Sequence, residues 1–161
     1  WQSACTAILD QAPSLRIFRA RHRPVSLTRM RDAGPPDTIP LAALAGAPVV
    51  AFAGLARPWT FKNTLEQLGA RVAGFVAFKD HHRFSPAQIQ HCVTLARQSG
   101  AAFLVTTAKD AVRLDPRSIP PGLHVLHVEA AIDDFQELGR FILRQCEESQ
   151  RSHGRPPVDR P

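Results

Sequence analysis

The sequence of 161 residues is 44% hydrophobic, which is ordinary for a globular protein and enough for one domain with a buried core. No stretch approaches the run of about eighteen apolar residues that a membrane-spanning helix needs, which excludes a chain that crosses a bilayer by itself. Lys and Arg number 20 against 14 Asp and Glu, and this excess favours anionic partners such as phosphates, lipid headgroups or nucleic acid.

The first forty residues divide into a weak helix, a basic segment and a connector. Residues 1–11 are mildly helical, and residues 15–31 alternate imperfectly between apolar side chains and arginines, which suits exposed strands or a two-stranded ribbon. The proline-rich run AGPPDTIP at 33–40 predicts a connector. We therefore expect three parts: the end of an upstream domain with the ribbon and linker (1–40), an α/β domain (41–149) and a disordered tail (150–161).

The basic segment contains no acid and six arginines: Arg16, Arg19, Arg21, Arg23, Arg29 and Arg31. Such a segment is either a solvated face or a surface that meets phosphates or anionic lipid headgroups. Nucleic acid is the weaker choice, because no recognised nucleic-acid motif accompanies the arginines. We expect an anionic membrane surface, and no nucleic acid, among the partners.

A strand, a helix and a second strand follow the connector. Residues 49–53 are a short apolar run that Gly54 breaks, as at the end of a buried parallel strand. Phe61, Leu65 and Leu68 recur at helical spacing before Gly69 ends the helix. Residues 72–78 form the second apolar run, which ends just before the sequence Asp-His-His.

The remaining elements repeat this alternation. Ser85 and Gln88 form a capping box at the start of a helix that Gly100 ends. Residues 103–105 predict a strand, which a short helix follows, and residues 123–128 predict another strand. The alternation indicates an α/β fold with a mostly parallel sheet and helices on both faces, Rossmann-like and preceded by the basic strand ribbon.

The last predicted helix begins with Asp133 as its cap and Gln136 at the reciprocal position. Five apolar residues are expected to form its core side: Phe135, Leu138, Phe141, Ile142 and Cys146. Cys92 lies on the apolar face of another predicted helix, so both thiols are expected to be buried in a reducing compartment, the cytoplasm by default. Because the chain starts at Trp1 without a signal-peptide pattern, we expect it to be part of a longer protein.

Asp80, His81 and His82 follow the second apolar strand, at the edge where open parallel sheets bind ligands. An imidazole titrates near neutral pH, and an adjacent carboxylate can orient it, so Asp80 and His81 are the candidate catalytic pair. His82 is a candidate substrate contact. The alternative is a turn in which Asp80 caps the following segment and the histidines are solvated.

A second cluster consists of Thr106, Thr107 and Lys109, where two hydroxyls, an ammonium and free backbone N–H groups suit an anionic oxygen. The alternative is that the threonines cap the helix and Lys109 pairs with an acid at the surface. Arg57, in the first strand-to-helix turn, is a weaker candidate for phosphate contact. No GxxxxGK[ST] motif occurs, so this chain has no cofactor-binding P-loop of its own. His124 and His127 do not complete a metal site, and we expect none.

Two separated signatures resemble one family. AFAG, Pro58, Phe61 and the Phe-x-Asp-His-His sequence, followed by the Thr-Thr-x-Lys-Asp-Ala-Val run at residues 106–112, resemble the carboxyl-terminal half of tetraacyldisaccharide 4'-kinase, the lipid A 4'-kinase of Gram-negative bacteria. The resemblance implies a P-loop-kinase-like fold and spans residues 48–114. The sequence departs from the pattern of this family at Ala108, where the family usually has Glu, and at Lys79, where the family commonly has proline.

What the resemblance implies is transfer of the ATP γ-phosphate to the 4'-hydroxyl of tetraacyldisaccharide 1-phosphate at the cytoplasmic face of the inner membrane. ATP and Mg²⁺ would be bound mainly by an amino-terminal domain that also carries the main aspartate base, so these residues alone are expected to be inactive. Asp80 and His81 would then face the acceptor sugar. The alternatives are a metal-dependent phosphoesterase of the Asp-His-His type and a non-enzymatic basic module that binds phospholipid or nucleic acid.

Overall fold

The computed structural model describes residues 2–31 and 34–152. Within that range the chain forms two compact units, one of residues 23–129 and one that combines residues 2–22 with 130–152. The predicted division at residues 40 and 149 concerns the domains of a longer protein and stays a prediction.

A six-stranded sheet has the order β2 (Asp37–Ile39), β1 (Ala20–Arg29), β6 (Leu123–Ile132), β5 (Phe103–Thr107), β3 (Pro48–Ala53) and β4 (Arg71–Ala77). The last four of these strands are mutually parallel, whereas β1 and β2 are antiparallel to each other. In the central register, Ala51 of β3 lies between Phe75 of β4 and Val105 of β5. The predicted α/β sheet, mostly parallel and preceded by a basic strand, is therefore confirmed.

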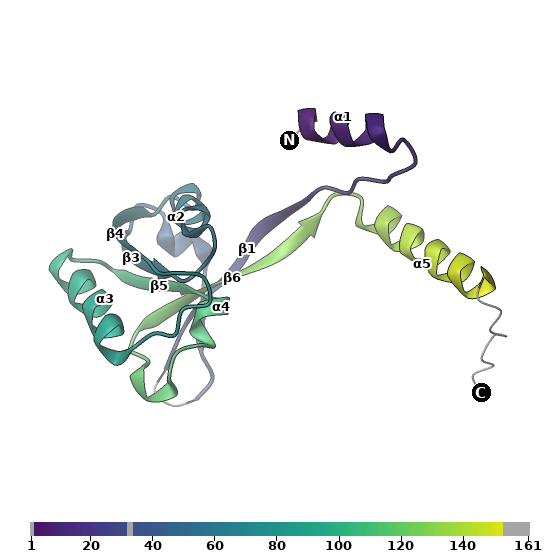
Figure 1. Ribbon diagram of the computed structural model, residues 1–161. Helices are drawn as coiled ribbons and strands as arrows, with labels where there is room; N and C mark the ends of the chain where they lie inside the picture. Colours follow the sequence, from purple (N-terminus) through teal and green to yellow (C-terminus); the bar gives the residue numbers. More distant parts are fainter. Residues whose placement is uncertain (1, 32–33, 153–161) are drawn as a thin grey trace, which may run out of the picture. The chain divides into compact units, whose positions relative to one another are not determined.

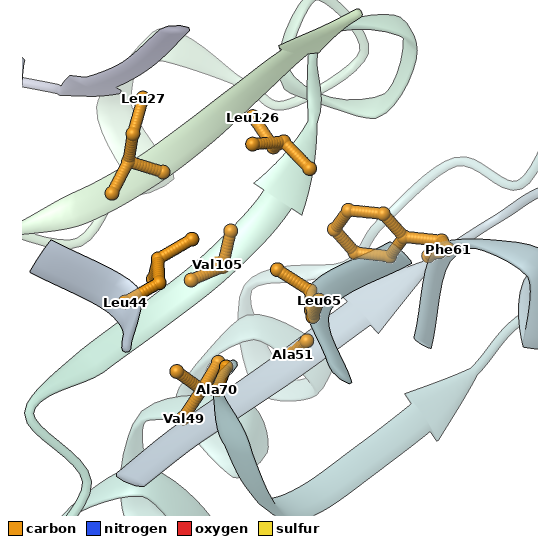
Figure 2. Close-up of a cluster of buried hydrophobic side chains, with 10 residues drawn as sticks. Leu27, Leu44, Val49, Ala51, Phe61, Leu65, Ala70, Val105 and Leu126 are labelled. Carbon is orange, nitrogen blue, oxygen red and sulfur yellow. The ribbon is translucent and has the colours of Figure 1, made fainter. Parts of the chain in front are cut away.

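The larger unit has a helix on each side of its parallel strands, as Figure 1 shows for α2 (Pro58–Gln67) and α3 (Pro86–Gln98). Successive side chains of a strand point to opposite faces, which divides the core into two clusters. Figure 2 shows the cluster on the α2 side, which also contains the short 3-10 helix η1 (Leu41–Leu44). Its buried side chains are Leu27, Leu44, Val49, Ala51, Ala53, Phe61, Leu65, Ala70, Val105 and Leu126.

The α3 side of the sheet has its own core. Phe52, whose neighbours Ala51 and Ala53 face α2, packs here with Ile89 and Cys92 of α3. Burial raises the pKa of the Cys92 thiol to about 11, so this thiol stays protonated and unreactive at neutral pH. The prediction of a buried Cys92 is confirmed.

The capping box predicted for α3 is present. The Ser85 hydroxyl accepts a hydrogen bond from Gln88 N at 3.3 Å, and the Gln88 side chain accepts one from Ser85 N at 2.9 Å.

Ser85→Ala removes the acceptor for one of the free N–H groups of the first turn of α3, so we expect the free energy of unfolding to fall by about 1 kcal/mol. Urea denaturation followed by circular dichroism measures this loss. Gln90→Ala, at an exposed site inside the same helix, is the control and should leave the midpoint nearly unchanged.

The smaller unit contains α1 (Gln2–Gln11) and α5 (Phe135–Ser152). The expected cap at Asp133 is wrong, because α5 begins one residue later than that cap requires. Asp134 precedes the helix with a φ of 56°, and the Asp133 carboxylate pairs with Arg21 at 3.3 Å. The predicted tail from residue 150 is also shortened, since α5 continues to Ser152, and residues 153–161 lie outside the described residues.

The apolar stripe of α5 is not a core face in the described residues, which corrects the prediction. Phe135 is 68% exposed and Ile142 is 50% exposed, and the Cys146 thiol, which was expected to be buried, is also exposed. Phe141 is half-buried and packs against Phe18 at a ring distance of 5.9 Å. None of the described helices is both long enough and apolar enough to span a bilayer.

Acids from other segments neutralise much of the arginine-rich segment. Within the smaller unit Arg16 pairs with Glu137 and Arg21 with Asp133, and within the larger unit Arg23 pairs with Glu129 and Arg31 with Asp37. These pairs are exposed, so each contributes about 0–1 kcal/mol to stability. Their main consequence is that the segment presents less net positive charge than its sequence indicates.

Candidate active site

Three parallel strands end together at one edge of the sheet, and the candidate residues follow them. Gly54 comes directly after β3, Asp80 and His81 follow β4, and Thr107 closes β5 at the start of the short helix α4 (Ala108–Ala111). Because β3 is paired in parallel with both β4 and β5, these segments lie at the same edge. Lys109, on α4, reaches Asp80 from there.

The Asp110 carboxylate is the centre of this edge, although sequence reasoning gave it no role. It is fully buried. Its Oδ2 accepts hydrogen bonds from Gly54 N at 3.0 Å and from Thr107 Oγ1 at 2.8 Å, and its Oδ1 lies 3.5 Å from Arg113 Nη1. The Thr107 hydroxyl in turn caps α4 by accepting from Asp110 N. Asp110 therefore ties the end of β3 to the segment after β5.

Gly54 is needed for space at this edge. A Cβ atom built on it would lie 3.2 Å from three atoms: Asp110 Oδ1, His82 Cβ and the backbone oxygen of Lys79. A side chain at residue 54 would therefore push apart the three segments. Glycine at this position therefore permits the close approach of two loops to the end of β3.

Asp80 is held by a cation and by the backbone. Its Oδ1 accepts hydrogen bonds from Lys109 Nζ at 3.2 Å and from His81 N at 2.9 Å. The hydrogen bond from Lys109 lowers the pKa of the Asp80 carboxyl below its ordinary value, although partial burial opposes this shift. The carboxylate is therefore charged at neutral pH. Any stability that the contact with Lys109 provides is present above the ordinary carboxyl range and is lost as the pH falls through the lowered pKa.

The two nitrogens of the His81 imidazole have different neighbours, Arg113 at Nδ1 and Asp80 at Nε2. Its backbone is left-handed, with a φ of 58°, a conformation that is uncommon for residues other than glycine. Arg113 Nη2 lies 3.0 Å from Nδ1. Because arginine can only donate, Nδ1 must be the acceptor, and the neutral ring carries its proton on Nε2. That Nε2 lies 3.7 Å from Asp80 Oδ2, and the His81 side chain is 73% exposed.

His82 is packed differently from His81. Its ring stacks on Phe78 with the centroids 4.8 Å apart and meets Phe84 edge-on, while Nε2 lies 2.9 Å from Gln88 Oε1. These contacts fix the half-buried His82 ring between β4 and the start of α3. They account for His82 as a structural residue, and its expected contact with a substrate stays a prediction.

The structure separates the members of the second predicted cluster. Thr107 and Lys109 join the edge described above, but Thr106 is fully buried and its hydroxyl donates to Phe52 O at 3.0 Å. Arg57 precedes α2 with an exposed side chain, and none of the described contacts links it to Asp80 or His81. Thr106 therefore serves the interior, the Thr107 hydroxyl is engaged by Asp110, and Lys109 is about half exposed at the edge; their expected contacts with an anion stay predictions.

The remaining predicted histidines have their own surroundings. His124 is buried against Phe103 with the ring centroids 4.9 Å apart, and burial lowers the pKa of its imidazole. His127 Nε2 lies 2.9 Å from Thr28 Oγ1. Among residues 2–31 and 34–152, no three His, Cys, Asp or Glu side chains are grouped so that they could hold a metal ion.

The edge combines an ammonium, a charged carboxylate, an imidazole and a guanidinium, which contact one another in that order from Lys109 through Asp80 and His81 to Arg113. These groups can orient and stabilise an anionic oxygen, and the Nε2–H of the exposed His81 side chain can donate to a bound oxygen. The model of the tetraacyldisaccharide-1-P 4'-kinase family matches residues 3–147 of this sequence. The chain belongs to this kinase family.

Relatives in the kinase family agree with this assignment. The chain is 45% identical over 115 residues to the tetraacyldisaccharide 4'-kinase of Anaeromyxobacter dehalogenans strain 2CP-C, which covers 70% of this chain and 29% of that protein. It is 51% identical over 79 residues to the kinase of Xanthobacter autotrophicus, covering 49% of this chain and 23% of that one. The chain therefore spans less than a third of the length of these kinases.

A solved structure from the same kinase family is similar as well. The crystal structure of the "apo" form of LpxK from Aquifex aeolicus in complex with ATP matches with a TM-score of 0.49 and 21% identity, over 84% of this chain and 40% of that one. The match of the family model to residues 3–147 confirms, at the level of the kinase family, the resemblance inferred from the Asp-His-His and Thr-Thr-x-Lys-Asp signatures. The roles of the individual residues remain predictions.

Proposed function

We propose that this chain is the carboxyl-terminal part of a lipid A 4'-kinase, which transfers the γ-phosphate of ATP to the 4'-hydroxyl of tetraacyldisaccharide 1-phosphate. One observation carries the proposal: in a chain of this kinase family, Asp80, His81 and Lys109 meet at the carboxyl edge of a parallel sheet. Phosphoryl transfer depends mostly on positioning and on neutralising charge, and this edge offers groups for both.

Asp80 and His81 are proposed to face the acceptor sugar. In the described state the lone pair of His81 Nδ1 is occupied by Arg113, so the group that His81 offers is the Nε2–H donor. This donor can bind the acceptor hydroxyl or the aspartate base proposed for the upstream domain. His81 can accept a proton at Nδ1 only after Arg113 withdraws. Asp80, charged at neutral pH, keeps Lys109 at the edge.

Lys109 is proposed to contact a phosphoryl oxygen, with Thr107 and Arg57 as weaker candidates, since the Thr107 hydroxyl donates to Asp110 Oδ2 and would have to leave it first. Lys109 is about half exposed, so its ammonium can turn from Asp80 towards an incoming anion. ATP and Mg²⁺ are assigned mainly to the upstream domain, because the sequence contains no P-loop motif and the described residues supply no metal ligand set. The same lack of a ligand set among these residues disfavours the phosphoesterase alternative, which needs two bound metals.

We place the reaction at the cytoplasmic face of the bacterial inner membrane, where the arginine-rich segment would lie near anionic headgroups. The contribution of this segment is expected to be modest, because Arg16, Arg21, Arg23 and Arg31 are each paired with a carboxylate. Nucleic acid is not expected among the partners of this segment.

Reconstitution tests the proposed activity. The complete protein that contains this chain should transfer ³²P from the γ-position of ATP to tetraacyldisaccharide 1-phosphate, and residues 1–161 alone should show no transfer, because they lack the P-loop motif that cradles the nucleotide phosphates. The proposal is wrong if the complete protein does not phosphorylate the disaccharide. The assignment of the nucleotide site to the upstream domain is wrong if residues 1–161 suffice. Manganese-dependent hydrolysis of a phosphodiester that Asp80→Asn abolishes would instead favour the phosphoesterase.

A further inference from the structure

Arg113 lies between a buried carboxylate and the candidate catalytic histidine, and neither signature of the family includes it. Its Nη1 faces Asp110 Oδ1 at 3.5 Å, and its Nη2 donates to His81 Nδ1 at 3.0 Å. The Asp110 side chain is fully buried, the Arg113 side chain is 21% exposed and the His81 side chain is 73% exposed. The guanidinium therefore connects the interior to the most exposed group of the edge.

The inner end of this connection is fixed. Asp110 is held by Gly54 N at 3.0 Å and by the Thr107 hydroxyl at 2.8 Å, so its carboxylate has little freedom. A planar guanidinium that is paired to such a carboxylate on one side has its other N–H groups aimed in a defined direction. Here that direction leads to His81 Nδ1.

The outer end fixes the chemistry of the imidazole. A guanidinium has no acceptor, so the contact exists only while Nδ1 carries a lone pair, and the ring proton must then be on Nε2. We propose that Arg113 is a positioning residue that holds His81 in its Nε2–H form, with Nε2 on the side of the ring that faces Asp80 Oδ2, 3.7 Å away. This inference rests on the proposed function for its catalytic consequence, but the assignment of the tautomer does not.

Lysine at this position would not do the same. An ammonium is a single point of charge, so it can stay with the buried Asp110 or reach His81, whereas the forked guanidinium meets both at once. Arg113→Lys thus keeps the charge beside Asp110 and should preserve the fold, but it should release the imidazole. Arg113→Met removes both contacts and is the more disruptive variant.

Nitrogen NMR of the ¹⁵N-labelled 161-residue chain tests the assignment. At about pH 9, where a free imidazole is neutral, His81 should show an unprotonated Nδ1 and a protonated Nε2. Its signals are identified by their loss in His81→Asn. In Arg113→Lys we expect the two nitrogen shifts to move towards each other, because the ring now samples both tautomers. Arg117→Met, which removes an exposed arginine of the neighbouring 3-10 helix η2 (Pro116–Ser118), should leave them unchanged.

The inference is overturned if His81 carries its proton on Nδ1, or if its nitrogen shifts in Arg113→Lys equal those of the unmodified chain. In the complete kinase, Arg113→Lys should lower kcat by about tenfold to a hundredfold with KM values within about threefold, the pattern of a misplaced catalytic group. An unchanged kcat would contradict the catalytic consequence. Absence of kinase activity in the unmodified protein would overturn the proposed function and leave the NMR result to decide the role of Arg113.

Discussion

Replacement of Asp110 by alanine is expected to lower the free energy of unfolding of the chain by about 3–5 kcal/mol, the range found when one partner of a buried ion pair is removed. Asp110 is fully buried and accepts hydrogen bonds from Gly54 N and from the Thr107 hydroxyl, while Arg113 supplies the opposite charge. Alanine would leave the buried Gly54 N–H without its acceptor, which alone costs about 1–3 kcal/mol. Urea denaturation followed by circular dichroism measures the change.

Two further variants separate the causes of this loss. Asp110→Asn keeps an oxygen acceptor for Gly54 N but removes the charge that faces Arg113. Its free energy of unfolding should therefore lie between that of the unmodified chain and that of Asp110→Ala. Asp115→Ala is the matched control, since Asp115 is an exposed aspartate that caps the 3-10 helix η2 by accepting from Arg117 N at 2.9 Å. We expect it to cost about 1 kcal/mol. If Asp110→Ala cost no more than Asp115→Ala, Asp110 would not hold the strand ends together.

The framework around the site was predictable because local patterns determine it. Residues 49–53 and 72–78 are apolar runs of strand length, and the glycine at 54 and the Asp-His-His sequence mark where they end. Ser85 and Gln88 define the start of α3 through contacts three residues apart. Parallel pairing then brings the ends of successive strands to one edge. These rules predicted the place of Asp80, His81 and Lys109 without any knowledge of distant contacts.

The central role of Asp110 could not be predicted in this way. Its partner Gly54 N is 56 residues away in the sequence, and from the sequence alone Asp110 is one acid in a short helix. The same limitation applies to Thr106 and Thr107, which are adjacent and identical in type. Thr106 donates to Phe52 O in the interior, whereas Thr107 caps α4, and only the pairing of β5 with its neighbours separates these roles.

The correction at α5 has a different physical origin. Periodicity correctly predicted a helix there and also which of its faces is apolar, as Phe135, Ile142 and Cys146 show. Periodicity does not specify what covers that face, and in the described residues Phe135 and Ile142 are exposed. Likewise, the charge of the basic segment was counted correctly, but Glu129 and Asp133, which pair with Arg23 and Arg21, come from about a hundred residues further along the chain.

Substitution of His81 should have the largest effect on catalysis. In the complete kinase, His81→Asn is expected to lower kcat by about a hundredfold to a thousandfold, the range for loss of one preorganised hydrogen-bond donor at the reacting centre. Asparagine accepts the left-handed φ of 58° and its amide oxygen can still meet Arg113, so the turn is preserved. What it lacks is the imidazole Nε2–H that His81 offers to a bound oxygen.

The matched control for this loss is His91→Gln, because His91 is exposed on α3 and belongs to no part of the proposed site. It should retain full activity.

Asp80→Asn should reduce kcat less than His81→Asn, by about tenfold to a hundredfold, since it removes the charge that fixes Lys109 but leaves the imidazole held by Arg113. Steady-state rates at saturating ATP and disaccharide distinguish these cases. A His81→Asn kinase with more than about a third of the wild-type kcat would show that this imidazole has no part in the chemical step, because loss of a preorganised donor costs far more. The turn would then act only through Asp80 and Lys109.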